Sequence, residues 1–155
     1  MWQRLVSGLR HVRTDERGFT LMELMIVVII VAILAAGGVV GYGFLIQRAV
    51  NSDAANFKTT METAVRLYES DKGTPAGNLA SGALAGALDD YVDALPTFTV
   101  TTTAPTASST AGYYVKCPAN GGNTWQVWAV RNGRVNDTDQ TFTASTVTVA
   151  DGCGA

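Results

Sequence analysis

A run without any charged residue extends from Leu24 to Gln47, and it limits what this chain can fold into more than any other feature. The run is 24 residues long, which at about 1.5 Å per residue is the length that a helix needs to cross a bilayer core. Only helices and closed barrels satisfy their backbone hydrogen bonds in lipid. The sequence therefore predicts a long apolar helix near the N-terminus and disfavours a purely soluble globular protein.

The segment before this run predicts how the helix would be oriented. Residues 1–18 contain four arginines and two carboxylates: Arg4, Arg10, Arg13, Arg17, Asp15 and Glu16. By the positive-inside tendency, this end stays in the cytoplasm. An ordinary secretory signal has an apolar run of about 7 to 15 residues before a small-residue cleavage site. Here the run is longer and contains no convincing A-x-A site, which indicates a retained membrane anchor.

One ionisable residue, Glu23, lies four residues inside the hydrophobic stretch that begins at Phe19. A carboxylate deep in a bilayer costs on the order of 2.5–3.5 kcal/mol on insertion scales. Two interpretations follow from its position. Glu23 either caps the first helical turn near the headgroups, where the helix dipole favours a negative side chain, or serves a function that needs a charge inside an apolar surface.

The residues from Arg17 to Val28, RGFTLMELMIVV, resemble the class III signal of type IV prepilins and the related pseudopilins. This resemblance implies that a membrane aspartyl peptidase, the prepilin peptidase, removes the leader 1–18 by cutting between Gly18 and Phe19. It also implies methylation of the new amino group on Phe19. In this family the residue at the position of Glu23 pairs with the amino terminus of a neighbouring subunit during filament assembly. A charge that is costly alone is tolerated when it is paired, which favours the assembly role over simple capping.

The apolar pattern continues after Arg48 in amphipathic form, with apolar residues spaced three and four apart from Ala54 to Tyr68. A basic last turn, a glycine and a proline in Lys72-Gly73-Thr74-Pro75 predict the helix end. Residues 19–48 are thus expected to form the transmembrane or filament-core segment, and 49–155 an exported head. Many type IV pilins have a proline where this chain has Val40; here glycines crowd the stretch instead, indicating close helix packing, a weak point, or both: Gly37, Gly38, Gly41 and Gly43.

The predicted head combines a short helix with a sheet. Ser81 is expected to cap a helix that continues to Leu95, and Pro96 ends it. Strand signals cover residues 97–103, 112–117, 124–130 and 140–149, and Asn132-Gly133 predicts a type I′ hairpin. We therefore predict an α+β, pilin-like fold, in which an antiparallel sheet of about four strands packs on the amphipathic half of a long N-terminal helical spine.

Two cysteines, Cys117 and Cys153, follow the anchor and would lie on the exported side. An even number of cysteines in an exported domain favours a disulfide, with two free thiols as the alternative. The pair also resembles the C-terminal disulfide-bounded region of many type IV pilins.

The head lacks the residues of a typical catalytic site. The one histidine, His11, lies in the leader, and Asp89, Asp90 and Asp93 are best interpreted as solvated surface charge. Asn136, Asp137 and Asp139 could ligate calcium, but a hairpin turn needs the same residue types. The Asn136-Asp137-Thr138 sequon and the Thr- and Ser-rich segment 101–110 leave glycosylation open. We expect no enzyme activity, no cofactor and no metal.

The sequence thus predicts a structural subunit of a type IV pilus, a helical homo-oligomer used for motility, adhesion or DNA uptake. Its expected partners are the prepilin peptidase, the pilus assembly machinery and the inner membrane, in which it is stored with the leader cytoplasmic before it reaches the extracellular pilus. A pseudopilin of a type II secretion or competence system is the close alternative. A membrane-tethered adhesin or DNA-binding module is the alternative of another class, although three basic against six acidic residues after Gly73 make nucleic-acid binding unlikely.

Overall fold

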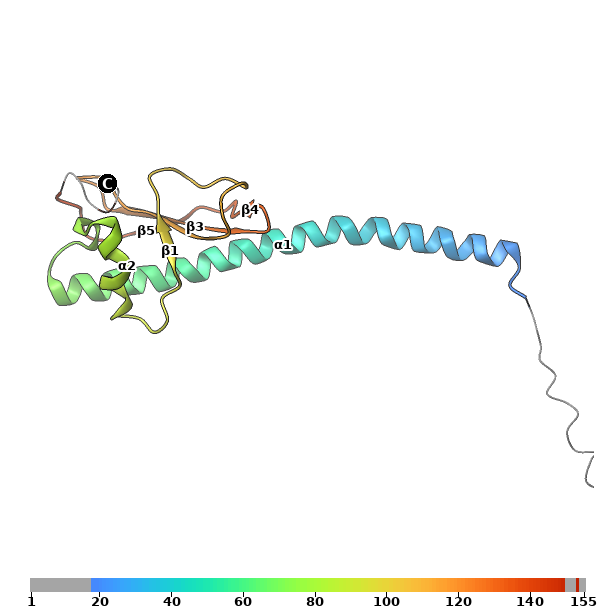
Figure 1. Cartoon of the computed structure of the whole chain (residues 1–155), viewed down its shortest axis with the longest axis horizontal. Coiled ribbons are helices and arrows are strands. Elements are labelled where there is room, and N and C mark those ends of the chain that lie inside the picture. Colours follow the sequence, from blue (N-terminus) through green and yellow to red (C-terminus); the bar gives the residue numbers. More distant parts are fainter. Residues whose placement is uncertain (1–17, 150–152, 154–155) are drawn as a thin grey trace, which may run out of the picture. The chain divides into compact units, whose positions relative to one another are not determined.

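The computed structural model describes residues 18–149 and 153. The chain divides into two compact units, Met1–Val40 and Gly41–Ala155, and the helix α1 (Leu21–Lys72) supplies residues to both. The remaining elements belong to the second unit, which we call the head: η1 (Ala76–Asn78), α2 (Ser81–Asp89), β1 (Phe98–Val100), β2 (Gly112–Lys116), β3 (Thr124–Arg131), β4 (Arg134–Val135) and β5 (Gln140–Thr143). The predicted α+β class, a long N-terminal helix followed by a sheet, is confirmed (Figure 1).

The sheet is centred on β3, the longest strand. β2 pairs antiparallel with one edge of β3, and β4 and β5 share the other edge. The sheet differs from the prediction in one pair, because β1 runs parallel to β2, with Phe98 opposite Tyr113. The 11-residue connection 101–111 is long enough to carry the chain back to the starting end of β1, whereas an antiparallel neighbour needs only a short turn.

The head buries one face of α1 against the sheet and α2 (Figure 1). The buried positions of α1 repeat at the predicted helical spacing: Val50, Ala54, Phe57, Met61, Ala64, Val65 and Tyr68. The sheet contributes Val115, Trp125, Val127 and Phe142 to this core, and α2 contributes Leu84 and Leu88. Fully burying one large apolar side chain contributes about 1.5–3 kcal/mol. The helix is therefore an integral part of the head core.

Polar and aromatic contacts fix the register of α1 on the sheet. The Arg131 guanidinium donates to Asp53 at 3.2 Å and lies 4.9 Å from the centre of the Tyr113 ring. Tyr113 in turn stacks on Phe57 with 4.3 Å between ring centres. The hydrogen bond to Asp53 raises the pKa of Arg131 above its ordinary value. Arg131 therefore links β3 to α1.

The hairpin at Asn132-Gly133 is confirmed. Both residues have positive φ, 50° and 68°, as a type I′ turn requires, and Arg131 pairs with Arg134. The final strand is shorter than predicted and stops at Thr143, because its partner β3 begins at Thr124, opposite Thr143. Beyond that point Val147 bonds to the Gly121–Gly122 turn instead.

The short helix also departs from the prediction at both ends. Ala80, rather than Ser81, occupies the N-cap position, and α2 ends at Asp89 rather than continuing to Leu95. After this end Tyr91 turns toward α1, where its hydroxyl donates to Asp71 at 2.6 Å and its ring meets Tyr68 edge to face. We attribute the early end of α2 to these contacts with α1.

Candidate assembly site

The first turn of α1 is capped by Thr20. The Thr20 Oγ1 accepts the backbone N–H of Glu23 at 3.2 Å, and the Thr20 carbonyl accepts the N–H groups of Glu23 and Leu24. The spacing Thr-x-x-Glu is a capping-box signature, and it is present in the sequence as Thr20-Leu21-Met22-Glu23. Sequence analysis missed this role of Thr20, although the spacing alone could have revealed it.

The carboxylate of Glu23 is exposed at this helix start. Gly18, Phe19, Thr20 and Glu23 line one open hollow, and the Phe19 side chain is 79% exposed. Within the described residues, Glu23 forms no ion pair. A charge here can therefore be reached by a group from outside the chain. Residues 1–17, which make up most of the predicted leader, lie outside the described residues.

The apolar surface after this turn is not covered by any of the residues that the structure describes. Every large hydrophobic side chain from Phe19 to Leu34 is at least 47% exposed. Among the described residues, one helix, α1, is long and apolar enough to cross a membrane, with a mean hydropathy of 2.9 over its most apolar window. Exposed apolar surface on this scale marks a contact with lipid or with other protein.

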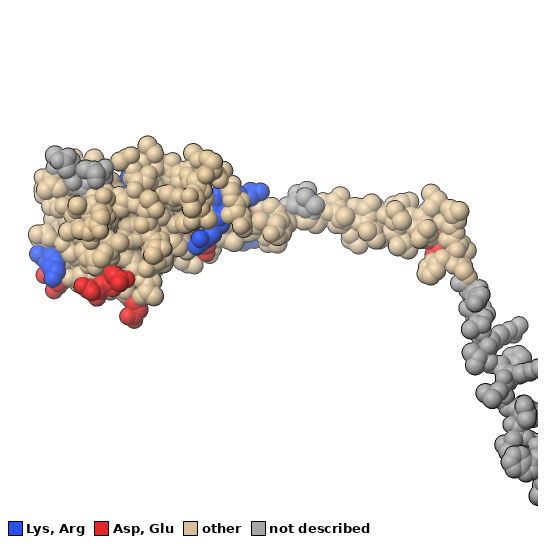
Figure 2. Space-filling model, in the orientation of Figure 1, with Lys and Arg blue, Asp and Glu red and all other residues tan. Residues whose placement is uncertain are grey.

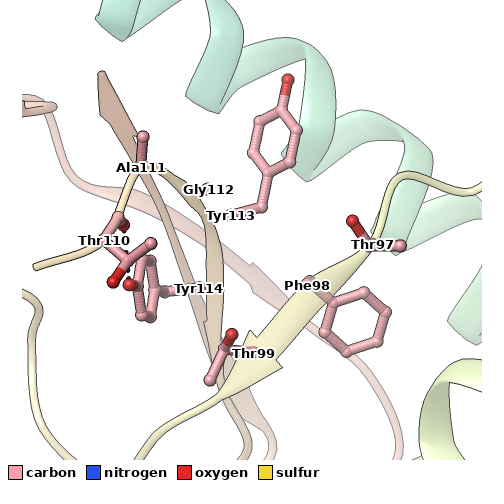
Figure 3. A pocket seen from close by; sticks show the side chains of 8 residues that line it. All are labelled: Thr97, Phe98, Thr99, Thr110, Ala111, Gly112, Tyr113 and Tyr114. Carbon is pink, nitrogen blue, oxygen red and sulfur yellow. Dashed lines mark hydrogen bonds between the residues drawn. The ribbon is translucent and has the colours of Figure 1, made fainter. Parts of the chain in front are cut away.

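The head contains a small hollow between the starts of β1 and β2, drawn in Figure 3. Its lining consists of threonines, aromatic side chains and small residues: Thr97, Phe98, Thr99, Thr110, Ala111, Gly112, Tyr113 and Tyr114. Tyr113 points toward the helix, whereas Tyr114 lies on the other side of the strand and donates its hydroxyl to the Thr110 carbonyl. The lining contains hydroxyl groups but no carboxylate, imidazole, amine or thiol, so the hollow itself supplies no base that would activate a threonine or tyrosine as a nucleophile.

The loop considered for calcium and for N-glycosylation uses its polar atoms internally. Asn136 is buried; its Oδ1 accepts the Ala129 N–H at 2.8 Å and its Nδ2 donates to the Thr138 carbonyl. The Asp137 carboxylate accepts from Asn51 at 2.6 Å. Across residues 18–149 and 153, no three His, Cys, Asp or Glu side chains gather as metal ligands. Asn136 therefore has a structural role, because it connects β3 to the segment after β4.

Replacing Asn136 with Ala should lower the free energy of unfolding by about 1–3 kcal/mol, because it leaves the buried Ala129 N–H without a partner. Denaturant unfolding of the full chain in detergent would measure the loss. Asn56→Ala, at an exposed position of α1, is the control and should change stability by less than about 0.5 kcal/mol. Equal stability of the two variants would contradict this role.

The predicted disulfide is present between Cys117 and Cys153, whose Cα atoms are 5.9 Å apart. Both cysteines are buried, and the Cys153 N–H donates to the Gly77 carbonyl at 3.1 Å. The bond thus attaches the C-terminal segment to the end of β2 and to η1.

The sequence is similar to a known family motif and to several known proteins. Residues 13–39 match the family described as the prokaryotic N-terminal methylation motif. A fimbrial protein of Neisseria meningitidis serogroup B is 35% identical over 126 residues, which cover 79% of this chain and 71% of that protein. A fimbrial protein of N. meningitidis serogroup A is 34% identical over 76% of this chain and 68% of its own length. Fimbrial protein EcpC of Eikenella corrodens is 42% identical over 81 residues, 52% of this chain and about half of that protein, 53%. No solved structure gives a significant match.

Proposed function

The chain belongs to the type IV pilin family, and from this premise we propose that it is a membrane-stored precursor that is cleaved and then polymerises into a surface filament. The observation that carries the proposal is the uncovered apolar helix that begins just after Thr20, with one carboxylate at its start. As a type IV pilus subunit, the chain is a structural protein and not an enzyme.

In this proposal the helix needs an apolar environment both before and after assembly. Before assembly, lipid covers the side chains from Leu21 to Leu34; in a filament, the equivalent helices of other subunits would replace the lipid. Because the exchange is between two apolar environments, little hydrophobic free energy opposes it. Release of the membrane anchor into a filament is therefore energetically feasible.

Glu23 gives this exchange its specificity in our proposal. An exposed carboxylate close to Phe19 can pair with the amino group of a neighbouring subunit once the leader is removed. Removing one member of a buried ion pair costs about 3–5 kcal/mol. A packing register that satisfies the charge is therefore strongly preferred over registers that do not.

The fimbrial names of the relatives favour a pilus over the pseudopilus of a secretion or competence system. We propose the prepilin peptidase and the pilus assembly machinery as partners, with the leader in the cytoplasm and the head exported. Motility, adhesion and DNA uptake are the candidate roles of the filament.

Processing gives a direct test of the proposal. The exported protein should begin at a methylated Phe19 and contain 137 residues, which are the 155 of the chain less the 18 of the leader. Gly18→Leu should accumulate as the uncleaved precursor, because a side chain next to the scissile bond clashes in a tight peptidase cleft. Intact-mass analysis of sheared surface material and of membranes would measure both effects.

Gly82→Leu provides the control, because a side chain at Gly82 meets open space on α2. This variant should be cleaved normally. An exported form that begins at Met1 or near Gln47, or normal cleavage of Gly18→Leu, would reject the processing step.

A further inference from the structure

The head holds two arginines beside exposed apolar side chains at the N-terminal end of its part of α1. The β3–β4 hairpin lies against the helix here, since Gln47 Nε2 donates to the Val135 carbonyl at 2.9 Å and Arg134 Nη1 donates to Gln47 Oε1 at 3.4 Å. The Nη2 atom of Arg134 lies 3.3 Å from the position that a Cβ on Gly43 would occupy. The missing side chain of Gly43 therefore lets this guanidinium rest on the helix.

Arg48 lies on the same stretch of helix, with its guanidinium 5.6 Å from the centre of the Phe44 ring. Arg48 and Arg134 are exposed, and neither has an ion-pair partner in the part of the chain that the structure describes. Asp53, the nearest acid on α1, is bonded to Arg131. Figure 2 shows basic side chains at this end of the head and most of the visible acidic ones at the opposite end. The two guanidinium groups therefore remain available to an anion from outside.

The residues around these arginines are apolar and exposed: Tyr42, Phe44 and Leu45 have exposed fractions of 66%, 64% and 63%. Aromatic side chains and arginines occur together where a membrane helix leaves the hydrocarbon, because their apolar stems or rings face the acyl chains while their polar ends stay in water. The segment 42–48 has this composition.

The distance of segment 42–48 from the start of the predicted membrane span also agrees with a position at the headgroups. Arg48 follows Glu23 by 25 residues, which corresponds to about 37 Å along a helix. The hydrocarbon core is about 30 Å thick, and about 40–45 Å with both headgroup layers. If Glu23 remains at the cytoplasmic headgroups, Arg48 reaches the headgroups of the opposite leaflet.

We propose that Arg48 and Arg134 bind the phosphate groups of anionic phospholipids in the outer leaflet of the inner membrane, and so hold the head on the bilayer surface before assembly. This inference rests on the proposed function as a membrane-stored precursor. A phospholipid supplies a phosphate immediately next to acyl chains, which matches guanidinium groups next to exposed rings. An acidic protein surface would match the guanidinium groups alone.

The test uses the full precursor in detergent micelles and native mass spectrometry, with phosphatidylglycerol or phosphatidylcholine added as the probe. The unmutated chain should retain phosphatidylglycerol preferentially. Each basic residue near an anionic surface strengthens binding about fivefold, so the double variant R48Q/R134Q should lose roughly 25-fold in phosphatidylglycerol affinity. R48K/R134K, which keeps both charges, should retain most of it, and K58Q/K116Q, which removes two other head cations, should bind normally.

Three results would overturn the proposal: no preference for phosphatidylglycerol, the same preference in R48Q/R134Q, or displacement of the lipid by inorganic phosphate at equal ionic strength. Normal lipid binding by R48Q/R134Q together with fewer filaments in cells would assign the arginines to a contact with a second subunit instead. Lipid selectivity that depends on both arginines, in a chain that never forms filaments, would support this site while rejecting the proposed filament function.

Discussion

Replacing Glu23 with Gln should prevent the chain from entering filaments while leaving membrane insertion and cleavage intact. The backbone cap survives this change, because Thr20 Oγ1 accepts the backbone N–H of residue 23 and not its side chain. What is lost is the negative charge, and an amino group left unpaired in an apolar filament core costs several kcal/mol at each subunit contact. The ratio of sheared surface subunit to membrane subunit, in cells making no other copy, should fall at least tenfold.

Thr20→Ala separates capping from charge pairing. It removes the side-chain cap and should cost about 0.5–2 kcal/mol of helix stability, yet it keeps the Glu23 carboxylate. We therefore expect Thr20→Ala to assemble far better than Glu23→Gln. If Glu23→Gln assembles as well as the unmutated chain, Glu23 does not direct assembly.

Removing the disulfide with the double variant C117S/C153S should produce the largest loss of head stability. The bond closes a loop of 37 residues, counting both cysteines of a pair separated by 36 positions. In the chain-entropy model this contributes roughly 3–4 kcal/mol, out of a total of about 5–15 kcal/mol for a typical domain. Denaturant unfolding of the full chain should show this decrease, and subunit abundance in cells should fall with it.

Reduction provides the matched control for this variant. Dithiothreitol should destabilise the unmutated chain by about the same amount and leave C117S/C153S unchanged. Recovery of two alkylatable thiols from native filaments would contradict a structural role for the bond.

Features that depend on neighbouring residues could be predicted from the sequence. The charge-free run predicted the first part of α1, because a backbone in lipid must satisfy its own hydrogen bonds. The three-and-four spacing after Arg48 predicted the second part, because it reflects the helical repeat. Asn132-Gly133 predicted its turn because few other residues accept two consecutive positive φ angles. The Thr20 cap is equally local, because it depends on the Thr-x-x-Glu spacing of residues 20–23.

Features that depend on distant partners could not be predicted in this way. The direction of β1 relative to β2 is set by the path of a loop of 11 residues, 101–111, whose composition fits either direction. The end of β5 at Thr143 is set by where β3 begins, and the end of α2 by contacts of Tyr91 with α1. The direction of β1 and the ends of β5 and α2 are therefore not determined by the sequence of these segments alone.

The contacts between α1 and the end of the sheet also constrain the order in which the head can fold. Asn51 bonds to Asp137, 86 positions later, and Arg66 and Glu69 bond to Thr143 and Ser145, 77 and 76 positions later. Contacts of such separation make folding slow, because a long loop must close before they form. If the head is exported as proposed, α1 crosses the membrane before the strands, because it precedes them in the sequence. The apolar face of α1 with Phe57 and Met61 is then exposed until the sheet has followed. During that interval this exposed apolar face makes the partly exported chain prone to aggregation.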